Sequence, residues 1–164
     1  ILKTMNRHYN AEEFSALLEK VRAEVPGVAI TTDIIVGFPG ETEELFEESL
    51  SFSAKQGFAR MHEFPYSLRP GTPAAKMEDQ VPQTEKKARV HRMQMLADAM
   101  AKNFHEAFLG ETAEVLLETE NDGIRDGLTD TYIRVYTDAE LPLGEIVPLK
   151  LTKLYKDGVW GEVL

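Results

Sequence analysis

The residues of this chain that are best placed to do chemistry lie between Ile30 and Thr42. An apolar run with Asp33 inside it ends in a Gly-Phe-Pro-Gly turn, and a helix is expected to begin near Thr42. Junctions between a strand and the following helix are where α/β proteins build ligand sites. Such a strand is typical of a parallel sheet covered on both faces, so Asp33 needs a polar partner or a ligand. The residues alone leave two interpretations open, a ligand site and a tight turn.

Charges near this turn restrict what it could bind. Gly37 would let a ligand approach the backbone, and the helix after Thr42 offers free N–H groups. Glu41, Glu43 and Glu44 would repel an anion from the same helix end. We therefore expect a neutral or zwitterionic ligand.

A second set of candidate binding residues runs from Phe64 to Thr72. It places an aromatic pair, a hydroxyl and an arginine at the end of another predicted strand, where they could stack on a base and hold a polar substrate. The histidines lack the close spacing of metal ligands, and surface or core positions are expected. They are His8, His62, His91 and His105.

Composition limits the possible functions. The 164 residues carry 18 Lys plus Arg against 28 Asp plus Glu, a formal charge of −10, so any RNA contact must use a local patch. The best candidate patch is interpreted as a solvated helix face: Lys86, Lys87, Arg89, His91 and Arg92. The absence of cysteine excludes disulfides and iron-sulfur ligation by these residues. Without a long apolar run or signal peptide, we expect a cytoplasmic protein with no membrane partner.

Helices and strands alternate in the first part of the chain. Asn10 and Glu13 resemble a capping box that starts an amphipathic helix with Phe14, Leu17, Leu18 and Val21 on its apolar face. Strands are predicted at Val28–Val36 and Phe58–Ser67. A helix from Glu43 to Gln56 should bury Phe46, Leu50 and Ala54. This order predicts right-handed crossovers and a parallel sheet.

The second part of the chain has a different pattern. After a loop at Leu68–Gln83, a long helix should be capped by Thr84 and closed by Gly110. Its apolar stripe is Val90, Met93, Leu96, Ala97, Met100 and Phe104. Turn signals between short apolar runs then predict a small antiparallel barrel. Its predicted strands are Thr112–Glu120, Thr131–Tyr136, Ile146–Tyr155 and Val159–Val163. We predict two domains, residues 1–110 and 111–164.

Three ordered motifs, Met5–Tyr9, Thr32–Thr42 and Tyr66–Ala74, resemble the radical S-adenosylmethionine methylthiotransferases over nearly the whole chain. The resemblance implies the C-terminal part of a partial (β/α) barrel followed by an OB-like β-barrel called TRAM, which contacts RNA. It implies S-adenosylmethionine and two [4Fe-4S] clusters as cofactors and the anticodon loop of tRNA as partner. A radical made from S-adenosylmethionine removes hydrogen from a C–H bond, and a methylthio group replaces it.

The resemblance also suggests roles by motif position, although no catalytic residue or metal ligand. Expected at the S-adenosylmethionine site are Thr32, Asp33, Ile35, Gly37, Phe64, Tyr66 and Ser67. Expected to meet substrate or RNA are Arg69, Thr72, Arg134, Lys150 and Lys153. Thr32 and Asp33 would contact the ribose or amino acid, and Ile35 and Gly37 would pack beside the adenine.

Two features bear on the substrate. One branch of the family modifies a ribosomal-protein aspartate with a motif like Tyr-Ser-x-Glu, whereas Arg69 in this chain favours tRNA. The segment Gly127–Val135 looks more like the MtaB type, which acts on N6-threonylcarbamoyladenosine, than the isopentenyladenosine-specific MiaB type. The expected reaction is therefore methylthio insertion at C2 of N6-threonylcarbamoyladenosine.

The chain departs from the family because it has none of the cluster-binding cysteines. We therefore expect a C-terminal fragment that is inactive alone. Its half-sheet should expose an edge at Val28–Val36 and self-associate there. Two alternatives stay open, a stand-alone RNA-binding module and an unrelated α/β enzyme that uses Asp33 as a base.

Overall fold

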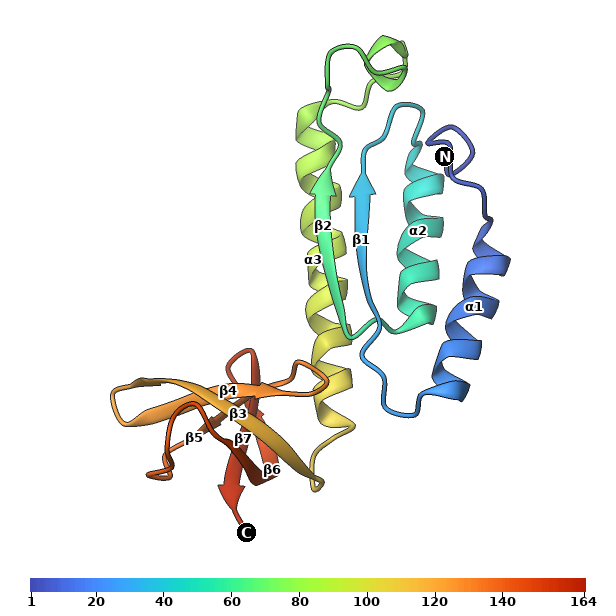
Figure 1. Ribbon diagram of the computed structural model, residues 1–164. Helices are drawn as coiled ribbons and strands as arrows, with labels where there is room; N and C mark the ends of the chain where they lie inside the picture. Colours follow the sequence, from blue (N-terminus) through green and yellow to red (C-terminus); the bar gives the residue numbers. More distant parts are fainter. The chain divides into compact units, whose positions relative to one another are not determined.

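The computed structural model describes residues 1–164 as two compact units, Ile1–Met100 and Ala101–Leu164. Along the chain (Figure 1) lie α1 (Ala11–Glu24), β1 (Thr31–Val36), α2 (Glu43–Gln56), β2 (Arg60–Pro65), η1 (Ala74–Lys76), α3 (Gln83–Glu106), β3 (Thr112–Asn121), β4 (Ile124–Thr129), β5 (Arg134–Thr137), β6 (Ile146–Tyr155) and β7 (Gly158–Val163). The units divide within α3, and the domain boundary near Gly110 stays a prediction. None of the helices combines the length and apolar character that a membrane crossing requires.

The strands β1 and β2 pair in parallel, as predicted, and both arrows point the same way in Figure 1. Each strand is shorter than predicted. Backbone hydrogen bonds continue the pairing at both ends, from Ala59 N–H to the Ile30 carbonyl and from Tyr66 N–H to the Val36 carbonyl. The carboxyl ends of both strands, and the loops that follow them, therefore lie at one edge of the sheet.

One face of this sheet packs against the helices, and the other is open. Val36 and Met61 belong to a buried cluster with Phe46 of α2 and Met93 of α3. Along β1 the burial alternates, and Thr31, Asp33 and Ile35 are exposed. The expectation of a strand covered on both faces is therefore wrong, because the helices cover only the side to which Val36 points.

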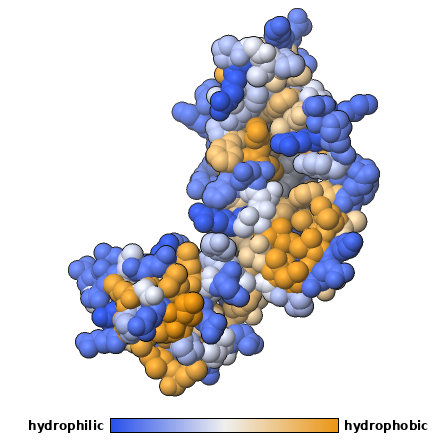
Figure 2. Space-filling view, viewed as in Figure 1, coloured by the Kyte–Doolittle hydropathy of each residue, from blue (hydrophilic) through white to orange (hydrophobic).

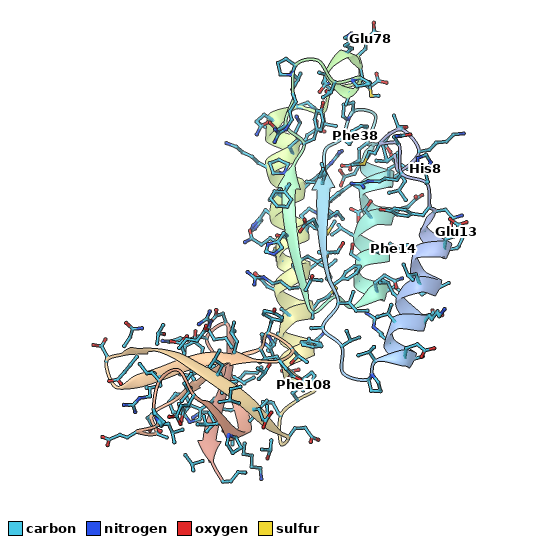
Figure 3. The ribbon with its side chains drawn as sticks, viewed as in Figure 1. His8, Glu13, Phe14, Phe38, Glu78 and Phe108 are labelled. Atoms are coloured by element: carbon cyan, nitrogen blue, oxygen red, sulfur yellow. The ribbon has the colours of Figure 1, made fainter.

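The capping box that starts α1 is confirmed: Glu13 N–H donates to the Asn10 side chain, and Asn10 N–H donates to the Glu13 carboxylate. Phe14 packs towards Phe52 of α2 (Figure 3), with ring centroids 6.3 Å apart. Leu17, predicted on the apolar face, is 54% exposed.

The buried face of α2 differs from the prediction. Phe46 is buried and Leu50 partly buried, but Ala54 is exposed, and the polar residues Ser53 and Gln56 are buried instead. The Gln56 side chain exchanges hydrogen bonds with Ser15 of α1, which satisfies its amide. Polar contacts between the helices thus replace part of the expected apolar stripe.

The long helix α3 begins one residue before Thr84, at Gln83, so Thr84 is not its cap. Lys86 N–H already donates to the Pro82 carbonyl in the first turn. The predicted apolar stripe is confirmed, because Met93, Ala97 and Met100 are buried. Phe104, at its far end, packs on the core of the second unit.

The second unit is a closed five-stranded barrel with the strand order β3-β4-β5-β7-β6. Sequence analysis missed β4 and described the barrel as antiparallel, whereas β5 and β7 pair in parallel. The core residues that fill it are Val115, Leu117, Ile133, Val135, Leu149, Leu151 and Val159. Gly127 permits strand contact, because a Cβ there would lie 1.9 Å from the Leu116 carbonyl oxygen.

Candidate functional site

The open face of the β1–β2 sheet gathers polar and apolar side chains from both strands. In the parallel register, Asp33 lies opposite His62, and Ile35 lies opposite Phe64. Ile35 is 38% exposed and Phe64 is 49% exposed, which is unusual for apolar side chains at a strand end. Figure 2 shows hydrophobic patches next to hydrophilic residues on this unit. The face offers a carboxylate and an imidazole next to an apolar platform.

The residues predicted to bind together do not all share this face. Because successive side chains alternate across a strand, Thr32 points to the helix-covered side, where its register partner is the buried Met61. Asp33, Ile35 and Phe64 share the open side. The structure thus separates the Thr32 side chain from that of Asp33.

The turn after β1 is held by a buried ion pair. Gly37 and Gly40 have φ values of +71° and +81°, which favour glycine, and Gly37 N–H donates to the Glu41 carboxylate at 2.8 Å. Arg89 of α3 contacts the same carboxylate and the Glu41 carbonyl, each at 2.9 Å. Glu41 therefore has a cationic partner, and counting it among the charges that repel an anion was wrong. Thr42 caps α2, and the helix begins beside it, as expected.

The basic patch on α3 is only partly the solvated face that was expected, since Lys87 and His91 are exposed. Lys86 and Arg89 are buried, at 7% and 4% exposure. Lys86 packs its stem on Gly37, where a Cβ would lie 2.5 Å from the Lys86 Cγ atom, and its ammonium donates to the Tyr66 carbonyl at 3.1 Å. These two cations join the ends of both strands to α3.

The loop after β2 is organised by its own side chains. Thr72 Oγ1 donates to the Arg69 carbonyl and accepts from Ala75 N–H, so Thr72 shapes the loop, while Arg69 is exposed. Phe38, labelled in Figure 3 at the tip of the turn, meets the Tyr66 ring edge-on at a centroid distance of 5.3 Å. Ser67 is exposed beside it.

A cavity of about 430 Å³ lies beside the turn. Its lining includes Pro39, Gly40, Leu45 and Asp79, and none of the predicted binding residues. We place the candidate site on the open face, because that is where the exposed apolar and ionisable groups gather.

The predicted RNA-contact residues of the barrel differ in whether their charges are already paired. Arg134 donates to Asp126 and lies 3.8 Å from Asp157, so its charge is already paired. Lys150 and Lys153 are exposed, and the Lys153 ammonium lies 5.4 Å from the centroid of the Trp160 ring.

A hydrogen-bonded tyrosine lies beside this arginine. Burial and the hydrogen bond that Tyr136 donates to Asp157 raise the pKa of Tyr136 to about 12. Burial raises the pKa of Asp157, but the bond from Tyr136, a backbone hydrogen bond and the Arg134 charge outweigh it and lower that pKa overall. Sequence analysis missed this network because its members come from three separate strands and turns.

The place of His62 in the candidate site could not be found from spacing. His62 belongs to the open face, and only the register with Asp33 indicates this. The structure contains no group of three or more His, Cys, Asp or Glu residues that could hold a metal ion. His8, His62 and His91 are exposed, and His105 is half-buried.

No protein-family model matches the chain. It is 42% identical, over all of its length, to the threonylcarbamoyladenosine tRNA methylthiotransferase MtaB of Bacillus subtilis (strain 168), of which it covers 38%. It is 41% identical, again over its whole length, to a tRNA-2-methylthio-N(6)-dimethylallyladenosine synthase of Acetivibrio thermocellus, of which it covers 35%. A synthase of the same name from Clavibacter sepedonicus is 47% identical over 79% of the chain.

The chain thus spans little more than a third of the length of the first two of these relatives. Both matches cover the whole chain, and so they include the open face, the turn and the barrel. The homologues of this chain are therefore tRNA methylthiotransferases, and the match covers its whole length.

Proposed function

We propose that this chain is the C-terminal portion of a radical S-adenosylmethionine enzyme that adds a methylthio group at C2 of N6-threonylcarbamoyladenosine in tRNA. The observation that carries the proposal is the 42% identity, over the whole chain, to a relative named for that nucleoside. Relatives named for dimethylallyladenosine are 38% to 47% identical, so the choice of nucleoside rests also on Gly127–Val135, while Arg69 favours tRNA over a protein substrate. The five-stranded barrel supports an RNA-contacting TRAM domain as part of the proposal.

The open face fits the S-adenosyl group of S-adenosylmethionine. Ile35 and Phe64 offer exposed apolar surface for a base, and Asp33 can accept hydrogen bonds from hydroxyl or ammonium groups. When bound, S-adenosylmethionine supplies the radical chemistry that the family resemblance implies. The protein's own contribution here is to bind and orient it.

Other residues would act through the backbone or through the turn. Thr32 lies on the helix-covered side, so only its main chain is proposed to face the ligand. Gly37 is covered by Lys86, so its role is to let the turn close rather than to touch the adenine. Tyr66 and Ser67 follow β2 at the same sheet edge and are proposed to contact the adenine through their backbone groups.

The iron-sulfur clusters do not fit these residues. The chain has no cysteine and no gathered set of metal-ligating side chains, so no step through a cluster is assigned to it. The proposed division of labour is that this portion binds S-adenosylmethionine and tRNA.

Nucleoside analysis tests the proposed function. The encoded protein that contains this chain would be expressed in a bacterium that lacks its own tRNA methylthiotransferases, and its tRNA would be digested for mass spectrometry. We expect 2-methylthio-N6-threonylcarbamoyladenosine. If only the isopentenyl product forms, the nucleoside assignment is wrong; if no methylthio nucleoside forms, the activity itself is wrong.

A further inference from the structure

The loop between β4 and β5 holds an exposed aromatic ring in an unfavourable backbone conformation. Tyr132 has a φ of +60°, a left-handed value that bulky residues rarely adopt, and its side chain is 79% exposed. Hairpin loops of this kind normally carry glycine or asparagine at the left-handed position. The ring itself makes no contact that would explain a tyrosine there, since most of its surface faces solvent.

The rest of the loop fixes this conformation. Tyr132 N–H donates to the Thr129 carbonyl, and Ile133 N–H donates to the Thr129 hydroxyl, each at 3.0 Å. The Thr129 and Thr131 hydroxyls are also hydrogen-bonded, and Ile133 is buried in the barrel core. A loop in which several contacts hold one residue in an unfavourable backbone conformation is a pattern found at binding sites.

A second residue with positive φ lies at the same end of the barrel. Lys156, in the turn between β6 and β7, has a φ of +49°. Its turn is adjacent to the start of β5, because β5 and β7 pair in parallel and Arg134 lies 3.8 Å from Asp157. The Lys156 ammonium is held 5.0 Å from the Tyr136 ring centroid and 5.3 Å from that of Tyr155. One end of the barrel therefore presents a free ring and a positioned cation.

Of the two cations at this end, Lys156 is the one that makes no ion pair with a carboxylate. Arg134 is paired with Asp126, and Asp157 accepts a hydrogen bond from Tyr136. Asp130 is the exposed acid of the same loop. An exposed ring stacks on any unpaired base, and a nearby ammonium attracts the phosphate that follows it.

We propose that Tyr132 and Lys156 form a contact for one unpaired nucleotide of RNA, with the base stacked on Tyr132 and the phosphate at Lys156. This inference rests on the proposed function for its choice of RNA over a protein partner. It moves the RNA contact away from Arg134, whose charge is occupied. The acidic barrel binds through this local pair, and not through its overall charge.

Equilibrium binding to a fluorescently labelled RNA hairpin with an anticodon-sized loop tests the contact in the 164-residue chain. Tyr132→Asn keeps a residue that tolerates positive φ but removes the ring, and its Kd should rise about 5- to 100-fold. Tyr132→Phe should bind within about twofold of the parent chain, because the stacking face remains. Lys156→Gln should reduce the slope of log K against log salt by about one.

The matched control for charge is Lys55→Gln, an exposed lysine in the last turn of α2. Circular dichroism would verify that every variant is folded. The inference is overturned if Tyr132→Asn binds like the parent chain, if Lys55→Gln weakens binding as much as Lys156→Gln, or if the parent chain binds no RNA. Nucleoside analysis is a separate measurement, so loss of the methylthio product would refute the proposed function and leave a Tyr132-dependent RNA contact standing.

Discussion

Replacing Arg89 with methionine tests whether the buried ion pair holds the turn at the candidate site. The Arg89 and Glu41 side chains are only 5% and 4% exposed, so Arg89→Met leaves a carboxylate buried with one remaining donor, Gly37 N–H. Removing one partner of a buried pair costs about 3–5 kcal/mol, and the remaining donor favours the lower end. With a denaturant slope of about 1–3 kcal/mol/M, the urea midpoint should fall by about 1–3 M.

Arg92→Met is the matched control, because Arg92 pairs with Glu43 and Glu47 at 41% exposure and exposed pairs contribute about 0–1 kcal/mol. Far-ultraviolet circular dichroism would follow the helices, and the single tryptophan, Trp160, would report on the barrel separately. The double variant Glu41→Gln/Arg89→Met should recover part of the loss, since a neutral amide still accepts from Gly37. A midpoint for Arg89→Met as high as that of Arg92→Met would refute the account of this turn.

Two further predictions concern the barrel. Gly127→Ala should strongly destabilise it, because the new Cβ would lie 1.9 Å from a backbone carbonyl oxygen. Gly123→Ala, with φ +77° and open space around it, should cost only about 1–2 kcal/mol of stability. Trp160 fluorescence during urea unfolding compares the two variants, and equal losses of stability would contradict the packing argument. Because the fold raises the pKa of Tyr136 from 10.0 to about 12, its stabilisation is complete below pH 10.0 and is lost as the pH rises through 12. Ultraviolet titration should show one late tyrosine that disappears in Tyr136→Phe, and no late tyrosine in the parent chain would contradict the burial of this hydroxyl.

Local signals predicted the elements that depend on neighbouring residues. The Asn10–Glu13 capping box was confirmed, and α2 begins beside Thr42 as expected, because each depends on contacts within one turn of helix. The cap expected at Thr84 was wrong, since the helix starts one residue earlier, where Lys86 N–H already reaches the Pro82 carbonyl. A hydroxyl residue therefore indicates the region in which a helix begins more securely than it identifies the capping residue.

Features that depend on distant partners were not predicted. Arg89 looks like a surface cation in the sequence and is buried because Glu41, 48 residues away, receives it. The strand β4 was missed because it contains Arg125, Asp126 and Gly127, which lower strand propensity. In the barrel, Asp126 accepts from Arg134, and Gly127 lies against Leu116.

The location of the candidate site was predicted from the sequence, but the set of side chains that share its open face was not. The carboxyl ends of two parallel strands were expected to gather Asp33, Ile35 and Phe64, and the register brings these residues to one face. Thr32 was expected beside Asp33, but strand alternation sends it to the other face. His62 lies on the same face only because of the register between β1 and β2, which cannot be deduced from the sequence.

Cleavage of S-adenosylmethionine by the encoded protein that contains this chain tests the central claim most directly, namely that the open face forms one wall of the S-adenosylmethionine site. Formation of 5′-deoxyadenosine would be compared for the parent protein, Asp33→Ala, and Asp98→Ala, an exposed acid on α3. Losing a hydrogen bond to a charged group should lower the rate at limiting S-adenosylmethionine about 10- to 100-fold in Asp33→Ala. Asp98→Ala should match the parent. Undiminished cleavage by Asp33→Ala would contradict the claim.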